Sequence, residues 1–127
     1  MPIVSVSMPE SMRRTLRDVQ RAQGFTGTSE LVRAALRLLV ADAREKEAVT
    51  GRVEAVIVVT HREDREGPVT RLKHQFEDVV KTHIHSKAGK GLCAEVFLVE
   101  GEGEKAAAMA RAFQREEGIK AVKMVVL

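Results

Sequence analysis

The hydrophobic pattern of this 127-residue chain changes at Thr50-Gly51, and this change divides the chain into two parts. Before it, apolar side chains recur every three or four residues, which is the spacing of helices with one buried face. After it, residues 53–60 form an almost continuous β-branched run, which suits a strand covered on at least one face. We therefore expect one domain at residues 1–48 and a second, of the α+β class, at residues 49–127.

The first part predicts a strand followed by two helices. Residues 3–8 alternate in the way a half-buried strand does, with an apolar face and a face that presents hydroxyls. A helix follows from Pro9, and Gly24 is its expected end. The second helix should begin at Thr28 or Ser29, because either hydroxyl can accept hydrogen bonds from free backbone N–H groups in the first turn.

The second helix carries more apolar surface than this part of the chain can bury by itself. Its apolar side chains cover a wide face: Leu31, Val32, Ala35, Leu36, Leu38, Leu39, Val40 and Ala43. A strand and two short helices are too small to enclose them. Dimerisation through strand and helix is therefore the expected solution.

The second part predicts the order β-α-β-β-α-β. The expected elements are a strand at 53–60, a helix after Gly67-Pro68, a short strand at 83–86, a turn at 87–91, a strand at 92–99, a helix between Gly103 and Gly118, and a strand at 121–127. This order matches the split βαβ arrangement of ferredoxin-like domains.

Two histidines and the chain's single cysteine lie close together in the sequence, at His83, His85 and Cys93. On a strand, the two histidines project from one face because side chains repeat every second residue. Imidazoles with one thiolate suit late transition metals such as nickel, copper or zinc. The pattern favours a metal site, but it does not specify which metal binds or with which coordination geometry. The alternatives are an exposed or hydrogen-bonded histidine pair and a small buried cysteine.

Composition argues against some other functions. Aromatic residues make up 3% of the chain, without Trp or Tyr, which disfavours a stacking platform for single-stranded nucleic acid. The net charge of +3 permits binding to a polyanion without demonstrating it. One cysteine cannot form an internal disulfide, and no N-terminal run looks like a signal peptide or a membrane span. We therefore expect a cytoplasmic protein with no membrane contact.

Several short motifs are typical of one known family. Val4-Ser5-Val6-Ser7, Gly24-Phe25 and the run from Thr28 to Arg37 are found in ribbon-helix-helix proteins. More diagnostic are Thr82-His83-Ile84-His85 and the later Leu92-Cys93-Ala94-Glu95-Val96 with Gly101. Over essentially its whole length the chain resembles the nickel-responsive transcriptional regulators (NikR). The resemblance implies an N-terminal ribbon-helix-helix (βαα) domain, CopG/MetJ/Arc-like, joined to a C-terminal ACT-like, metal-sensing domain.

The resemblance implies that the N-terminal domain binds double-stranded operator DNA. Strands from two chains then enter the major groove as an antiparallel ribbon. Ile3, Ser5 and Ser7 match the outward positions, where hydroxyls contact several bases and an apolar side chain meets a thymine methyl. Thr28 and Ser29 match the start of the helix that points at a backbone phosphate.

The resemblance also implies one nickel ion per subunit, held in a planar arrangement, with another late transition metal as an alternative. His83, His85 and Cys93 match three ligands from one subunit, and a facing subunit supplies the fourth. His74 is the expected fourth ligand. Glu77, one helical turn further along, is the alternative.

The remaining histidine, His61, is expected just after the first strand, beside Arg62. Mixed charge there favours a solvated loop. Phosphate contacts or a weaker metal site are the alternatives, since the equivalent loop of the family approaches DNA.

These features predict a nickel-responsive repressor rather than an enzyme. The resemblance implies homodimers through the N-terminal domain and a homotetramer through the C-terminal domain, with metal as corepressor. One alternative is a ribbon-helix-helix regulator whose ACT-like domain senses a small molecule. A metalloenzyme is disfavoured because no general base is well placed near His83 and His85, and an antitoxin fits only the first part of the chain.

Overall fold

The computed structural model describes residues 1–47 and 50–127, and contacts divide the chain into two compact units. Unit 1 is Met1–Arg44 and unit 2 is Glu45–Leu127. None of the helices in the described residues combines the length and the apolar character that crossing a membrane requires.

Unit 1 contains the helix α1 (Glu10–Gln23) and most of α2 (Thr28–Glu47), whose last three residues belong to unit 2. Gly24 ends α1 as expected: its φ of 73° lies in the left-handed region, which glycine adopts without strain. The N–H of the next residue, Phe25, donates to the carbonyl of Gln20 at 3.0 Å and closes the helix end. The second helix begins at Thr28, which confirms the position predicted from the hydroxyl residues.

The strand expected at residues 3–8 does not form in the single chain. These residues are exposed and do not form a strand. A strand exists only through backbone hydrogen bonds to a neighbouring strand, and the described residues of unit 1 contain no second strand. The strand prediction is therefore wrong for one chain by itself.

Unit 1 buries little of its apolar surface. Among its described residues, Leu31 alone is buried. Large apolar side chains remain exposed on the N-terminal segment and on both helices, including Ile3, Val4, Val6, Met12, Val19, Leu36, Leu38, Leu39 and Val40. A single copy of unit 1 thus lacks the core of an independently stable domain.

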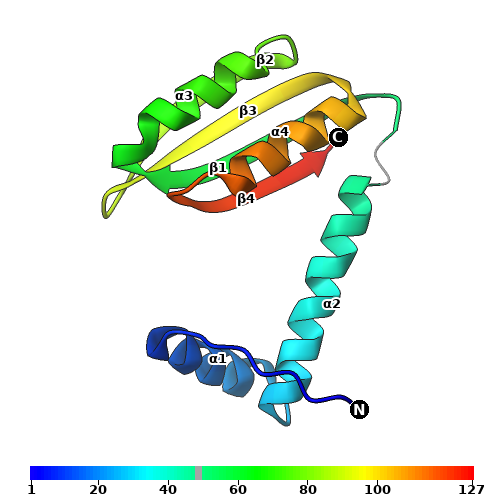
Figure 1. The fold of residues 1–127 in the computed structure, drawn as a ribbon, viewed down its shortest axis with the longest axis vertical. Helices are drawn as coiled ribbons and strands as arrows, with labels where there is room; N and C mark the ends of the chain where they lie inside the picture. Colours follow the sequence, from blue (N-terminus) through cyan, green and yellow to red (C-terminus); the bar gives the residue numbers. More distant parts are fainter. Residues whose placement is uncertain (48–49) are drawn as a thin grey trace. The chain divides into compact units, whose positions relative to one another are not determined.

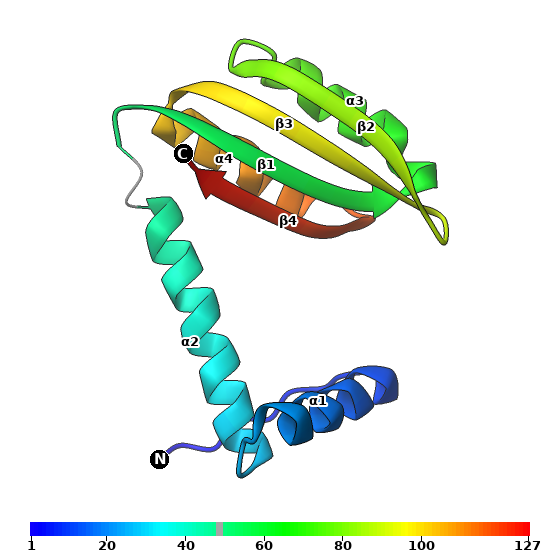
Figure 2. The same ribbon diagram turned by 180° about the vertical axis from the view of Figure 1, so that it is seen from behind.

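Unit 2 has the predicted order β-α-β-β-α-β. Its elements are β1 (Arg52–Arg62), the 3-10 turn η1 (Glu63–Arg65), α3 (Glu66–Gln75), β2 (Val80–Gly89), β3 (Leu92–Glu102), α4 (Gly103–Arg115) and β4 (Ile119–Val126). The strands pair antiparallel in the order β2-β3-β1-β4. This confirms the ferredoxin-like arrangement. Both helices cover one face of the sheet, and the view from behind shows the strands in front of them (Figures 1 and 2).

The central hairpin is tighter than expected. A turn was predicted at 87–91, but β2 continues to Gly89, so that Lys90-Gly91 alone connect the strands. Both connecting residues have positive φ, 56° and 73°, which is typical of the two-residue turns that match strand twist. The tighter turn keeps β2 and β3 paired well beyond the two predicted metal-binding histidines.

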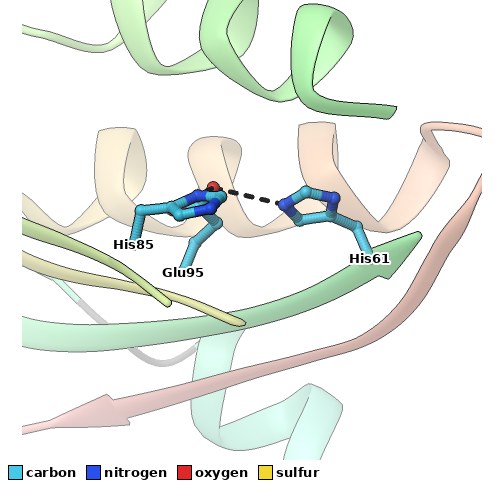
Figure 3. Close-up of side chains that lie close together, drawn as sticks. All are labelled: His61, His85 and Glu95. Atoms are coloured by element: carbon cyan, nitrogen blue, oxygen red, sulfur yellow. Dashed lines mark hydrogen bonds and ion pairs between the residues drawn. The ribbon is translucent and has the colours of Figure 1, made fainter. Parts of the chain in front are cut away.

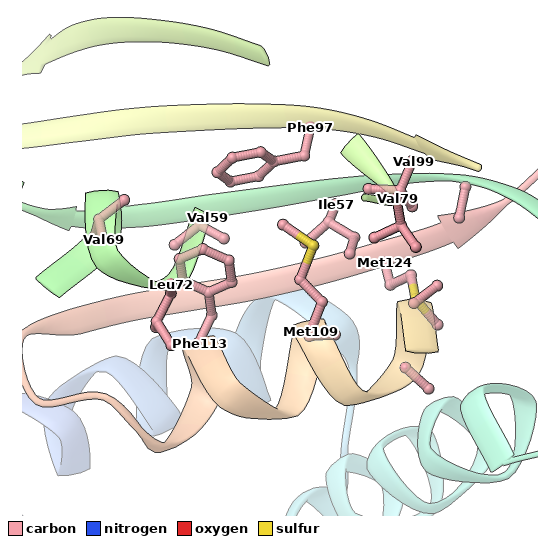
Figure 4. Close-up of a cluster of buried hydrophobic side chains, with 14 residues drawn as sticks. Ile57, Val59, Val69, Leu72, Val79, Phe97, Val99, Met109, Phe113 and Met124 are labelled. Carbon is pink, nitrogen blue, oxygen red and sulfur yellow. The ribbon is translucent and has the colours of Figure 1, made fainter. Parts of the chain in front are cut away.

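The core of unit 2 lies between the helices and the covered face of the sheet (Figure 4). Alternate residues of β1 and β3 point into it, among them Ile57 and Phe97. From α4, Met109 and Phe113 close the core, and the rings of Phe97 and Phe113 stack with their centroids 5.4 Å apart. The aromatic pair therefore fixes α4 on the centre of the sheet.

Substituting Phe113→Ala should lower the free energy of unfolding by about 3–5 kcal/mol, because it leaves a cavity beneath α4. Urea titration followed by circular dichroism measures the change. Gln114→Ala, on the exposed side of the same helix, is the matched control and should stay within about 0.5 kcal/mol of the parent. Similar losses in both variants would contradict this account of the core.

Candidate metal centre

Strand register brings five side chains with possible ligand atoms to the helix-covered face of the sheet. The strand β3 lies between β2 and β1, and its residues Cys93 and Glu95 are buried on that face. On β2, His85 pairs with Glu95, and His83 shares its face two residues earlier. On β1, His61 pairs with Cys93. Side chains from three strands therefore converge close to α3.

A pocket of about 190 Å³ opens between α3 and the two strands β2 and β3. It is lined by Glu66, Val69, Thr70, Lys73, His83, His85 and Glu95. The imidazoles of His83 and His85 are 22% and 35% exposed. His83, His85 and Glu95 thus border a space that an ion from solvent can reach.

Glu95 is the centre of the hydrogen-bond network. Its carboxylate is 3% exposed and contacts three imidazoles. His83 Nε2 lies 2.5 Å from Oε2, His85 Nδ1 lies 2.6 Å from Oε1, and His61 Nε2 lies 3.2 Å from Oε1. Figure 3 shows the rings of His85 and His61 close to the Glu95 carboxylate, with a dashed line from the carboxylate to His61. One buried carboxylate therefore orients three of the four histidines in the chain.

The surroundings keep Glu95 ionised. Burial has the largest single effect and raises the pKa, but the hydrogen bonds from His85, His83 and His61 together lower the pKa below its ordinary value. A buried negative charge is stable only when positive charge or hydrogen-bond donors compensate it. The negative charge of Glu95 therefore favours a positive charge next to it, such as a metal ion bound to the imidazoles.

Cys93 belongs to an adjoining group of donors. Its buried thiol donates to Glu66 Oε1 at 3.9 Å, and His85 Nε2 lies 3.5 Å from the same oxygen. Ligand atoms of Glu66, His85 and Cys93 all lie within 4.8 Å of one another. Burial raises the pKa of the thiol, and the charges of Glu66, Glu63 and Glu95 raise it further. A metal would bind the thiolate and displace the proton.

His83 lies outside the donor group that contains Cys93. Its ring stacks on Phe97, with centroids 4.6 Å apart and planes 6° from parallel. Lys73 Nζ lies 3.5 Å from Nδ1, and an ammonium can only donate, so Nδ1 accepts and Nε2–H donates to Glu95. Among the described residues, His83 is in neither three-donor group that could hold an ion.

The fourth predicted ligand lies apart from this centre within one chain. His74 is on α3, 65% exposed, with Nδ1 3.6 Å from Glu77 Oε2. Glu77 is exposed just beyond the helix. Both residues are candidates from a facing subunit, and their role stays a prediction.

The expectation of a solvated loop at His61 is wrong. The strand β1 continues to Arg62 because its pairing with β3 persists through the pair of His61 with Cys93. The His61 side chain is fully buried. The mixed charges that suggested a loop begin only after this residue.

Two carboxylates near the centre were missed as candidate ligands. Glu95 lies two residues from Cys93 on a strand, so the alternation of side chains already placed both on one face. No comparable signal exists for Glu66, which reaches the centre only because α3 begins above it.

The residues predicted to contact DNA are accessible in unit 1. Ile3, Ser5 and Ser7 are exposed, as is Ser29 in the first turn of α2. Thr28 is exposed as well, and its hydroxyl donates to Gln20 Oε1 at 3.2 Å. All five positions are therefore accessible from solvent.

Comparison with known proteins places the C-terminal residues in one family. Residues 55–127 match the NikR C terminal nickel binding domain. The chain belongs to the NikR family. Its family and its relatives make the protein a regulator and not an enzyme.

Relatives from archaea extend over most of the chain, and each carries the name "Putative nickel-responsive regulator". One from Halobacterium salinarum is 35% identical over 107 residues, covering 82% of this chain and 75% of the relative. One from Haloarcula marismortui is 32% identical over 107 residues, covering 82% and 77%. One from Methanopyrus kandleri is 30% identical over 128 residues, covering 97% and 89%.

Two solved structures share a fold with 61% of this chain. An uncharacterized protein from Thermotoga maritima has a TM-score of 0.55 at 12% identity, with 99% of its own length covered. The C-terminal domain of the MgtC protein from Mycobacterium tuberculosis has a TM-score of 0.53 at 15% identity, with 89% covered. Identities this low indicate a common fold alone.

Substituting Glu95→Ala should destabilise unit 2 by about 2–4 kcal/mol, because it leaves the buried imidazole of His61 and the partly buried imidazoles of His83 and His85 without their acceptor. The measurement is urea unfolding in the presence of a chelator, so that no metal contributes. Glu117→Ala, at an exposed position, serves as control and should unfold like the parent within about 0.5 kcal/mol. Parental stability in the Glu95 variant would show that the carboxylate does not organise this site.

Proposed function

We propose that this protein is a cytoplasmic, nickel-responsive transcriptional regulator that represses its target genes when metal is bound. The observation that carries the proposal is the meeting of His85 and Cys93 beside α3, with His83 on the same face. Imidazole and thiolate donors suit nickel among the late transition metals. Membership of the NikR family supports the same conclusion.

The proposed ligands come from two chains. His83, His85 and Cys93 would hold the ion from one subunit, and His74 of the partner subunit would complete the set, with Glu77 as the alternative. His83 would exchange its hydrogen bond with Glu95 for the metal, and the carboxylate would remain as an acceptor for ligand N–H groups. When bound, one nickel ion per subunit supplies a link between two chains.

The N-terminal part is proposed to act as a ribbon-helix-helix domain on double-stranded operator DNA. Residues 3–8 of a second copy would provide the backbone partner that the segment lacks within one chain. Ile3, Ser5 and Ser7 would then face base edges, while Thr28 and Ser29 approach a phosphate. The exposed apolar side chains of unit 1 support such a homodimer, because pairing two copies would bury them.

The sheet face opposite the helices supports a homotetramer through unit 2. Neighbouring strands place apolar side chains on this uncovered face: Val56, Val58, Ile84, Val96, Leu98 and Val125. Two of them, Ile84 and Val125, are 58% and 47% exposed in the single chain. Association through this face removes apolar area from water.

Metal and DNA binding would be coupled through assembly. An ion that joins two subunits favours arrangements in which those subunits are correctly placed. Such arrangements fix the spacing of the DNA-binding dimers, so that metal raises affinity for one operator spacing.

Equilibrium dialysis of the full chain should find one nickel ion per subunit. His83→Ala, Cys93→Ser and His74→Ala should each weaken nickel affinity by at least about 10–100-fold, the loss known even for outer-shell partners of a metal. Gln75→Ala, beside His74, is the matched control and should bind like the parent. Less than one ion per subunit, with His83→Ala unchanged, would instead favour small-molecule sensing by this domain.

Nickel should raise affinity for DNA at fixed salt, where the salt is held constant because phosphate contacts depend strongly on it. A sequence selected from random duplexes by the nickel-loaded protein serves as the probe in a gel-shift titration. Ser5→Ala and Ser7→Ala should each cost about 0.5–1.5 kcal/mol of binding, the net value of one hydrogen bond, while Ser11→Ala on α1 should cost nothing measurable. Equal affinity with and without nickel would contradict the corepressor role.

A further inference from the structure

The three donors His61, His85 and Glu95 form a second group, of which the proposed nickel set uses only His85. One ligand atom from each lies within 4.8 Å of the others. They come from β1, β2 and β3 of a single chain, and Figure 3 shows both rings close to the carboxylate. This group contains no sulfur and needs no residue from a partner subunit.

The hydrogen bonds of His61 point independently to a cation. Its Nδ1 lies 2.7 Å from the carbonyl oxygen of Arg62, and its Nε2 lies 3.2 Å from Glu95 Oε1. Both neighbours are acceptors, whereas a neutral imidazole carries a single N–H. A neutral ring can donate to only one of these two acceptors, and a metal ion between Nε2 and Glu95 would satisfy the other contact. Metal-bound histidines commonly donate their other N–H to a backbone carbonyl, which the Arg62 oxygen provides here.

The two nitrogens of His85 face different donor groups. Nδ1 lies 2.6 Å from Glu95 Oε1, and Nε2 lies 3.5 Å from Glu66 Oε1, which is next to the Cys93 thiol. The same ring thus borders the sulfur-free group on one side and the thiol on the other. An ion held with His61 and an ion held with Cys93 would compete for this ring.

The geometry points to a sulfur-free zinc site in which His61, His85 and Glu95 of one chain are the ligands. Two imidazoles and a carboxylate are a set that zinc accepts, with a fourth position left for water. Zinc does not require a thiolate, whereas the set proposed for nickel includes one. The regulatory consequence rests on the proposed function: zinc held within one chain occupies His85 without tying two subunits together.

Cobalt(II), which substitutes for zinc and absorbs visible light, tests the ligand set in the full-length reduced protein. Titration should give the d–d bands of bound cobalt without a thiolate-to-cobalt charge-transfer band. Zinc should displace the cobalt and abolish the bands. Cys93→Ser should bind with affinity within about 3-fold of the parent, whereas His61→Gln and Glu95→Gln should lose at least about 10-fold.

A charge-transfer band in the parent that disappears in Cys93→Ser would overturn the assignment, as would failure of the parent to bind cobalt. Circular dichroism and thermal unfolding establish that each variant is folded. If His61→Gln does not fold, the charge-transfer band of the parent and the cobalt affinity of Cys93→Ser still decide whether sulfur is a ligand.

Sedimentation of the same protein with nickel or with zinc separates this inference from the proposed function. Nickel should promote subunit association and zinc should not. Zinc-driven association abolished by Cys93→Ser would overturn the single-chain site. Absence of nickel binding would instead remove the proposed nickel sensor and leave the cobalt and zinc result intact.

Discussion

The buried carboxylate of Glu95, compensated by three imidazoles, is the interaction on which the candidate site depends. A charge at this position would be costly inside the sheet–helix layer without those donors. Pairing on both sides of β3 fixes the carboxylate, with His85 opposite it on β2 and the strand of His61 on its other side. The rings are consequently oriented by the backbone register before any metal binds, which is the kind of support that a ligand shell needs.

The two units differ in how far they can stand alone. Unit 2 encloses a complete core around Phe97 and Phe113, so its strand register, and with it the site, is set within one chain. Unit 1 exposes most of its large apolar side chains. Association therefore has a clear energetic origin in unit 1 and on the open sheet face of unit 2, and a ligand that joins chains can act on that association.

The site also illustrates how one ring can serve two chemistries. His85 lies between a group with sulfur, completed by Cys93 and Glu66, and a group without it, completed by His61 and Glu95. A softer metal ion prefers the group with the thiolate, and a harder one prefers the group with imidazoles and a carboxylate. The two groups would affect subunit association differently. The group without sulfur lies within one chain, whereas the proposed nickel set includes a ligand from a second chain.

The sequence by itself determined the order of elements, because hydrophobic periodicity and glycine positions reflect local backbone preferences. It also indicated His85 and Cys93, whose residue types and spacing carry metal chemistry. Glu95 could also have been predicted as a site residue, because the alternation of side chains along a strand puts it on the same face as Cys93. Only the tertiary structure extended β1 through His61 and placed Glu66 over the site, because strand length and helix position depend on pairing and packing between distant segments. The N-terminal strand was predicted but does not form in one chain, since a strand needs a hydrogen-bonding neighbour that local sequence cannot supply.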